Sequence, residues 1–145
     1  MYEIRKRKND IRAKYKALRA ELDRTLKAEM DAKICENFFS LATYRYASVL
    51  LMYSPKPDEV NVLPIAERAL RDGKKVAFPR CIPDSHDMEY YYVTSLDQLT
   101  RGSYGLLEPT TDLPLYDRES TEPSACIIPA IVYDKGGYRL GYGKG

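Results

Sequence analysis

The sequence predicts an α/β domain with a mostly parallel sheet flanked by helices, and three observations lead to this fold class. Residues 47–53 form a continuous apolar run that is too short for a helix, as in a buried parallel strand. A helical stretch between Asn61, its expected cap, and Asp72 follows, with Gly73 in the position that ends a helix. Residues 75–78 then provide a second strand. This order closes a βαβ unit, whose crossover is right-handed.

Two amphipathic helices precede the first strand. Apolar residues at spacings of three, four and seven predict a helix over residues 3–22, and Thr25 is expected to cap a second one. The first apolar stripe contains Ile4, Ile11, Tyr15, Leu18 and Leu22. The second contains Leu26, Met30, Ile34, Phe38 and Leu41. We expect both stripes to pack in the core and not to form a ligand surface.

The second half of the chain predicts further strands. Residues 88–93 fit a half-exposed strand, residues 95–99 a short helix, and residues 125–132 a second buried run that Pro129 interrupts. Residues 108–124 contain three prolines and predict a loop over the surface. His86 lies in a polar cluster typical of a surface turn.

Length and cysteine content limit the class of protein. A chain of 145 residues suits one domain, residues 1–145, with a sizeable core. Cys35, Cys81 and Cys126 are odd in number and widely spaced, which favours reduced thiols and a cytoplasmic location over a disulfide framework or a zinc site. No apolar run approaches the ~18 residues of a membrane span.

The net charge is only +2, but the basic residues are concentrated at one end. Residues 1–19 hold eight Lys and Arg and two acids. This pattern fits either a solvated helix face or a surface that contacts an anion or a nucleic acid.

A second basic segment lies at residues 134–145, where five glycines alternate with two lysines and one arginine. Glycine allows the backbone N–H groups to approach phosphate oxygens, and the cations balance their charge. The segment is not a Walker A loop, because Gly145 stands where Ser or Thr is required. An ordinary glycine-rich hairpin is the alternative interpretation.

Five blocks of sequence together resemble the 5-formyltetrahydrofolate cyclo-ligase family. Residues 137–145, Gly-Tyr-Arg-Leu-Gly-Tyr-Gly-Lys-Gly, match its signature G-x-R-L-G-x-G-x-G. Residues 8–12 are similar to its opening K-x-x-L-R, and Leu18-Arg19 follow at the family's spacing. The other blocks are residues 53–60, 73–80 and 105–109. The resemblance implies a three-layer Rossmann-like fold of the NagB/RpiA-like type.

The resemblance also implies a ligase of one-carbon metabolism that forms a C–N bond. Such an enzyme uses ATP and Mg²⁺ to close 5-formyltetrahydrofolate (folinate) to 5,10-methenyltetrahydrofolate, through a phosphorylated formyl intermediate, with release of ADP and phosphate. The formyl oxygen is a poor leaving group, so phosphoryl transfer activates the formyl carbon for attack by N10. The enzyme must orient both ligands and balance phosphate charge.

Site residues follow from the same resemblance. Tyr53, Glu59 and Pro129 are expected to bind the folate, although Glu59 could equally be an exposed turn acid, and Tyr53 and Pro129 could simply be core residues. The residues expected to bind the nucleotide are Lys8, Arg12, Arg139, Gly141, Tyr142, Gly143, Lys144 and Gly145. Arg139 and Lys144 are also the expected catalytic cations.

The family's signature continues into Tyr-Tyr-Asp and a helix, where this sequence stops. That Asp is the family's magnesium-contacting position, so we expect no metal ligand within residues 1–145. We favour a truncated cyclo-ligase, weakly active or inactive, over a short paralogue that has lost activity. The alternative function is a non-catalytic module that holds nucleotide or RNA phosphate. We expect a cytoplasmic monomer with folinate and ATP as ligands, and neither nucleic acid nor membrane as partner.

Overall fold

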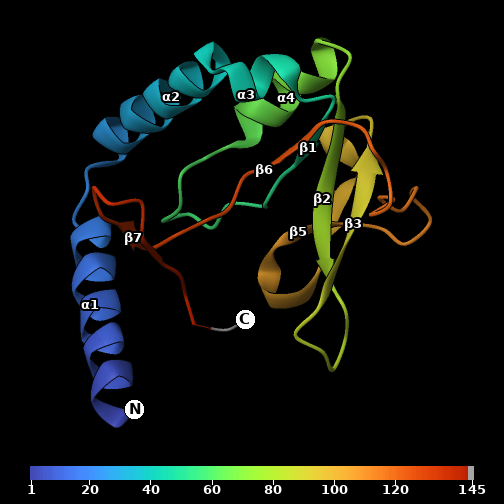
Figure 1. Ribbon diagram of the computed structural model, residues 1–145. Helices are drawn as coiled ribbons and strands as arrows, with labels where there is room; N and C mark the ends of the chain where they lie inside the picture. The colour runs from blue at the N-terminus through green and yellow to red at the C-terminus, as the bar shows by residue number, and fades with distance from the viewer. Residues whose placement is uncertain (144–145) are drawn as a thin grey trace.

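A four-stranded mixed sheet in the order β3-β2-β1-β6 forms the centre of the computed structural model, which describes residues 1–143 (Figure 1). β1 (Val49–Leu51) pairs in parallel with β2 (Lys75–Cys81) and with β6 (Ser124–Cys126). β3 (Met88–Val93) is antiparallel to β2 at the sheet edge. The α/β fold with a mostly parallel sheet flanked by helices is therefore confirmed.

Helices α2 (Arg24–Ser40), α3 (Ala42–Tyr46) and α4 (Leu63–Arg71) contribute to the core beside the sheet. α1 (Tyr2–Ala20), α2 and α3 precede β1, and α4 connects β1 to β2. Leu50, Val76 and Phe78 are fully buried and alternate along their strands, so they share one face of the sheet. On that face they pack in one cluster with Cys35 of α2 and Ile65 of α4. The predicted βαβ unit is confirmed.

The remaining elements are short. η1 (Leu96–Gln98), a 3₁₀ helix, is the short helix predicted for this stretch, and Ser95 caps it in a capping box. β4 (Leu99–Arg101), η2 (Ser103–Gly105) and β5 (Leu107–Pro109) follow, and β4 and β5 form an antiparallel pair that contacts β2. β7 (Val132–Tyr133) and β8 (Arg139–Leu140) form a separate hairpin. No helix among residues 1–143 is long and apolar enough to cross a membrane.

The loop expected at residues 108–124 is partly paired. Its first residues complete β5, and its middle pairs with β3, where Tyr92 N donates to Pro114 O at 2.8 Å and Tyr116 N donates to Tyr90 O at 2.7 Å. Residues 110–123 thus form the expected surface loop, and its middle in addition supplies partners to β3, an edge strand whose free backbone groups need them.

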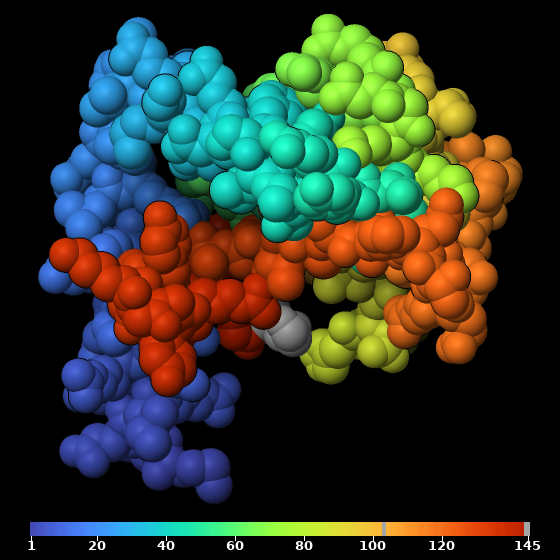
Figure 2. Space-filling model, turned by 45° about the horizontal axis from the view of Figure 1, so that its top comes forward, coloured from blue at the N-terminus to red at the C-terminus, as the bar shows by residue number. Residues whose placement is uncertain are grey.

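The expectation that both N-terminal apolar stripes pack in the core is wrong for α1 and for most of the α2 stripe. No residue of α1 is buried, and Leu18 is 48 % exposed. α2 buries Asp31 and Cys35, while Leu26 and Met30 stay exposed. Figure 1 shows α1 beside the sheet and not against it, and in Figure 2 its N-terminal part projects from the body of the molecule. Periodicity identifies an apolar face but not what covers it.

Element ends also differ from the prediction. Asp23, and not Thr25, caps α2, because its carboxylate accepts from the N–H groups of Thr25 and Leu26. α4 begins one residue later than expected, after Val62, although the Asn61 side chain still accepts from Leu63 N at 3.2 Å. The apolar run of residues 125–132 is divided between β6 and β7, two strands of different sheets.

Candidate functional site

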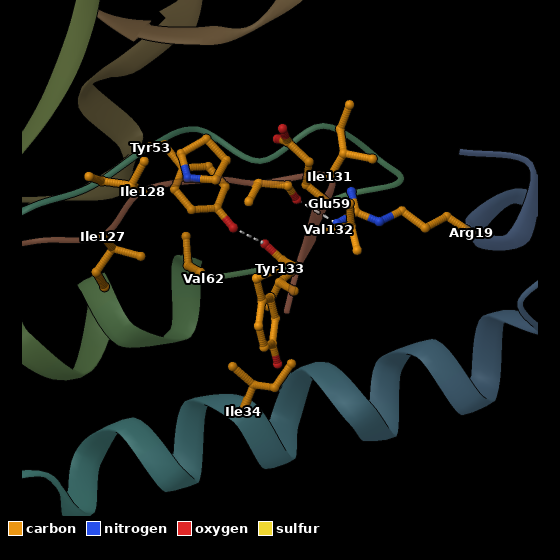
Figure 3. Close-up of a pocket in the computed structure, with 13 residues that line it drawn as sticks. Arg19, Ile34, Tyr53, Glu59, Val62, Ile127, Ile128, Ile131, Val132 and Tyr133 are labelled. Carbon is orange, nitrogen blue, oxygen red and sulfur yellow. Dashed lines mark hydrogen bonds between the residues drawn. The ribbon is translucent and has the colours of Figure 1, made fainter. Parts of the chain in front are cut away.

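An apolar cavity of about 410 Å³ lies where the segments that follow β1 and β6 meet (Figure 3). β1 and β6 are adjacent and parallel, and ligands of open α/β sheets bind beyond the carboxyl ends of such strands. Tyr53 follows β1, and Pro129 follows β6. Both line the cavity together with Glu59, so the three predicted folate residues come together in one place.

Glu59 is held in a hydrogen-bonded turn at the wall of this cavity. Its side chain is not that of an exposed turn acid, because the residue is only 5 % exposed. Its Oε2 accepts from Lys56 N at 2.7 Å, and its own N–H donates to Lys56 O at 3.0 Å. The Tyr53 hydroxyl donates to Val60 O at 2.9 Å. These bonds fix a buried carboxylate at the cavity wall, and a buried carboxylate needs polar partners.

α2 anchors the far end of the same turn. Asp31, itself buried, accepts from Asn61 N at 3.2 Å and from Lys27 Nζ at 2.6 Å. The Cys35 thiol donates to Asn61 O at 3.5 Å. Ile34 of α2 lies on the cavity wall. One helix therefore positions the turn and also contributes to the pocket that the turn borders.

A second cavity, of about 330 Å³, lies between α1 and the C-terminal segment. Lys8 and Arg12 of α1 line it opposite Tyr142 and Gly143. Arg12 Nε donates to Gly141 O at 2.8 Å. A Cβ atom on Gly143 would lie 2.8 Å from Arg12 Nη2, and Gly143 has a φ of 77°. Only glycine fits this position without a shift of the Arg12 side chain.

Tyr142 lines the second cavity and lies near Glu59, which lines the first. Its ring lies 5.1 Å from Lys16 Nζ and 4.6 Å from Lys56 Nζ, within the range of cation–π contacts. Its hydroxyl is buried, and burial followed by the neighbouring Glu59 carboxylate raises its pKa. Burial and then Glu59 also raise the pKa of Tyr53. The glycine-rich segment and the Glu59 turn therefore share one electrostatic environment.

Comparison with known proteins agrees with this arrangement. The model of the 5-formyltetrahydrofolate cyclo-ligase family matches residues 4–145. The chain belongs to this family. A probable 5-formyltetrahydrofolate cyclo-ligase of Schizosaccharomyces pombe is 28 % identical over 141 residues, which are 96 % of this chain and 69 % of that protein. The prediction of an enzyme of this class is therefore confirmed at the level of the family.

Solved structures give the same result. The NMR structure of the 5,10-methenyltetrahydrofolate synthetase of Aquifex aeolicus has a TM-score of 0.81 and 26 % identity, over 95 % of this chain and 68 % of that one. The synthetase of Mycoplasma pneumoniae, at 21 % identity and a TM-score of 0.67 over 95 % of this chain and 73 % of its own, shares the fold.

In this cyclo-ligase family member, the predicted nucleotide residues separate into two groups. Lys8, Arg12, Tyr142 and Gly143 come together, with Gly141 bound to Arg12. Arg139 lies exposed on β8 and lines neither cavity itself, although Tyr133, its register partner on β7, lines the first one. Lys144 and Gly145 lie outside the described residues.

Residues 132–140 form the glycine-rich hairpin that was the alternative interpretation of this segment. Asp134 Oδ1 accepts from Gly136 N at 2.9 Å and from Tyr138 N at 3.0 Å, so this acid stabilises the turn. Gly137 has a φ of 85° at the turn. The structure thus places a plain hairpin before the part of the segment that contacts α1.

Two of the sequence blocks that resemble the family, residues 73–80 and 105–109, line neither cavity and pack against each other. Arg80, at the end of one block, donates to Pro109 O at 3.0 Å and lies 3.7 Å from the carboxylate of Glu108 in the other. Glu108 is 3 % exposed. This contact joins β5 to β2, so the role of these two blocks is to stabilise the fold.

Metal ligation and three unpredicted contacts complete the description. Within residues 1–143 no group of three or more His, Cys, Asp or Glu side chains could hold a metal ion, and the three cysteines are unpaired.

Sequence reasoning gave no role to Lys16, Arg19 or Lys56. Lys16 and Arg19 lie four and seven residues after Arg12, which places them on its face of α1. That spacing was the available signal.

Proposed function

We propose that this chain carries the ligand sites of an ATP-dependent cyclisation of 5-formyltetrahydrofolate to 5,10-methenyltetrahydrofolate. The formyl oxygen attacks the γ-phosphorus, and the bond to the β,γ-bridging oxygen breaks, so that ADP leaves. N10 then attacks the activated formyl carbon, the C–O bond breaks to release phosphate, and N10 loses its proton. The products are 5,10-methenyltetrahydrofolate, ADP and phosphate.

The folate half of the proposal rests on the cavity beyond β1 and β6. Its size is within the range of small-molecule sites, and its lining is mainly apolar with a few polar groups. Glu59 offers a buried carboxylate to the N–H groups of a pteridine ring. Tyr53 and Pro129 offer flat walls for the ring. Fixed groups of this kind hold N10 near the formyl carbon without a further ordering cost.

The nucleotide half rests on α1 and the glycine-rich segment. Lys8 and Arg12 would neutralise phosphate oxygens, while Gly141 and Gly143 would allow their close approach. Arg139, Tyr142, Lys144 and Gly145 complete the proposed site, with Arg139 and Lys144 as catalytic cations. Mg²⁺ would neutralise further phosphate charge, but the described residues supply no ligand set for it, and no step here depends on it.

One observation carries the proposal: Tyr142 lines the α1 cavity, with Lys16 and Lys56 on its ring, and its hydroxyl lies near Glu59, which lines the other cavity. A phosphoryl donor in the α1 cavity and a folate beside Glu59 would therefore be neighbours, as direct phosphoryl transfer requires. We further propose a cytoplasmic monomer that binds neither nucleic acid nor membrane.

The experiment is a titration of the chain with folinate and ATP, with product formation followed by the absorbance of the methenyl group. The proposal expects folinate binding that varies little with salt, and cyclisation that is weak at most in this chain and that requires ATP. Binding of RNA that falls steeply with ionic strength, together with no folinate binding, would instead support the non-catalytic phosphate-binding module.

A further inference from the structure

Arg19 carries a buried donor that the described structure leaves without a partner. Its Nη2 donates to Ala130 O at 2.6 Å, which fixes the guanidinium against the segment that follows β6. Its Nη1 is buried and has no hydrogen-bond partner within residues 1–143. An unsatisfied buried donor on a charged group is costly, so such a group in a native protein calls for a ligand or another acceptor.

The position of Arg19 indicates what kind of ligand it serves. Arg19 lines the same cavity as Tyr53, Glu59 and Pro129, and it reaches that cavity from the C-terminal end of α1 (Figure 3). Burial and Glu59 raise the pKa of Tyr53 and of Tyr142, and the positive charge of Arg19 acts in the opposite direction on both. No ion pair joins Arg19 to Glu59 among the described residues, so their charges face one cavity without satisfying each other.

The pteridine ring of a folate has an edge that suits a carboxylate beside a guanidinium. That edge presents two donors, the 2-amino group and N3–H, next to one acceptor, the 4-oxo oxygen. Glu59 can accept from the donors, and a guanidinium N–H can donate to the oxygen. We propose that Arg19 is a substrate-binding residue whose Nη1 donates to the 4-oxo oxygen of the bound pteridine. This inference rests on the proposed folate site and assigns a specificity residue within it.

The proposal can be tested through a ligand preference that Arg19 would not affect if its role were purely structural. Arg19→Lys retains the positive charge and one nitrogen that can reach Ala130 O, but a single nitrogen cannot occupy both guanidinium positions. Folinate and its 4-amino analogue, in which an amino group replaces the 4-oxo oxygen and N3 loses its hydrogen, are titrated into both proteins. The lost N3 hydrogen affects Glu59 equally in both proteins, so the change in preference between them reports the contact with the 4-oxo oxygen. Arg7→Lys is the matched control, because Arg7 is exposed on α1 and lines neither cavity.

We expect the unmodified protein and R7K to prefer folinate over the 4-amino analogue by about ten- to a hundredfold, the range of a hydrogen bond to a charged group. In R19K this preference should fall severalfold, with an unchanged circular dichroism spectrum. An unchanged preference in R19K, even if both ligands bind more weakly, would overturn the role of Arg19 but not the proposed folate site. Absence of folinate binding to the unmodified protein would overturn the site and this inference together. If R19K does not fold, Arg19→Gln takes its place, with the same ratio as readout.

Discussion

Arg12 Nε donates to the carbonyl of Gly141 at 2.8 Å, and this bond joins the first helix to the glycine-rich segment across 129 positions of sequence. The same side chain also holds Asn9, through Nη1 and Asn9 Oδ1 at 2.7 Å. One residue therefore shapes the cavity proposed for the nucleotide and supplies charge to it. This double role leads to the first prediction.

Arg12→Lys should weaken ADP binding by about tenfold, because a lysine cannot make both bonds and also face a phosphate. Isothermal titration with ADP measures the effect. Arg7→Lys is the control, since it changes an exposed residue of the same helix in the same way. Equal ADP affinity of R12K and the unmodified protein would contradict the assignment of Arg12.

Gly143→Ala should disturb the glycine-rich segment even without a ligand, because the new methyl would lie 2.8 Å from Arg12 Nη2 at a φ of 77°. Gly141→Ala has no atom within 4 Å of the new methyl and should keep the stability of the unmodified protein. If phosphates approach the backbone at this segment, G141A should still lose ADP affinity. Thermal unfolding and ADP titration of the two variants separate the two effects. Similar melting temperatures for both variants would argue against the close contact with Arg12.

Asp23→Ala should lower the free energy of unfolding by about 1 kcal/mol, because it removes the side-chain cap of α2. Thr25→Ala should change it by less than about 0.5 kcal/mol, since no cap hydrogen bond involves the Thr25 side chain. Urea unfolding of both variants is the measurement. A larger loss in T25A would show that the helix begins where the sequence suggested.

Tyr44→Phe should destabilise the protein in a way that depends on pH. The Tyr44 hydroxyl donates to Asp72 Oδ2 at 2.6 Å, and this bond, more than the nearby Arg68, lowers the pKa of Asp72. A lowered folded-state pKa gives stability that is present above the unfolded value and is lost as the pH falls through the folded value. The difference in the free energy of unfolding between Y44F and the unmodified protein should therefore be largest at neutral pH. It should shrink in acid, as the pH falls below the usual pKa of an Asp side chain.

Unfolding measured between pH 7 and pH 2 follows this difference, and Tyr46→Phe is the control because Tyr46 is 71 % exposed. Phe at position 44 keeps the ring contacts with Phe38 and Phe39, so only the hydroxyl is tested. A difference that does not vary with pH would contradict the coupling of Tyr44 to the charge of Asp72.

Local pattern predicted what depends on neighbours in sequence. The apolar run up to Tyr53 and the helix after it predicted the βαβ unit, because a continuous apolar run of this length is too short for a helix. Family resemblance selected Tyr53, Glu59 and Pro129, which meet only because β1 and β6 are adjacent. That adjacency is a long-range pairing and leaves no mark in local spacing.

The remaining features depend on tertiary contacts that no single segment encodes. The burial of Glu59 follows from the turn held by Asp31 of α2, and the exposure of Leu18 follows from the position of α1 beside the sheet. Asp23 replaced Thr25 as cap because both residue types cap helices, and only the backbone conformation decides between them. Arg19 was recognised as part of a motif, but its unpartnered nitrogen is visible only in three dimensions.

The central claim is that two neighbouring cavities bind two different ligands, folate beside Glu59 and nucleotide beside Arg12. The most direct test titrates folinate and ADP separately into the unmodified chain, E59Q and R12K. We predict that E59Q loses about tenfold or more in folinate affinity and keeps its ADP affinity, and that R12K shows the opposite pattern. Equal losses of both ligands in both variants, or no loss in either, would contradict the account.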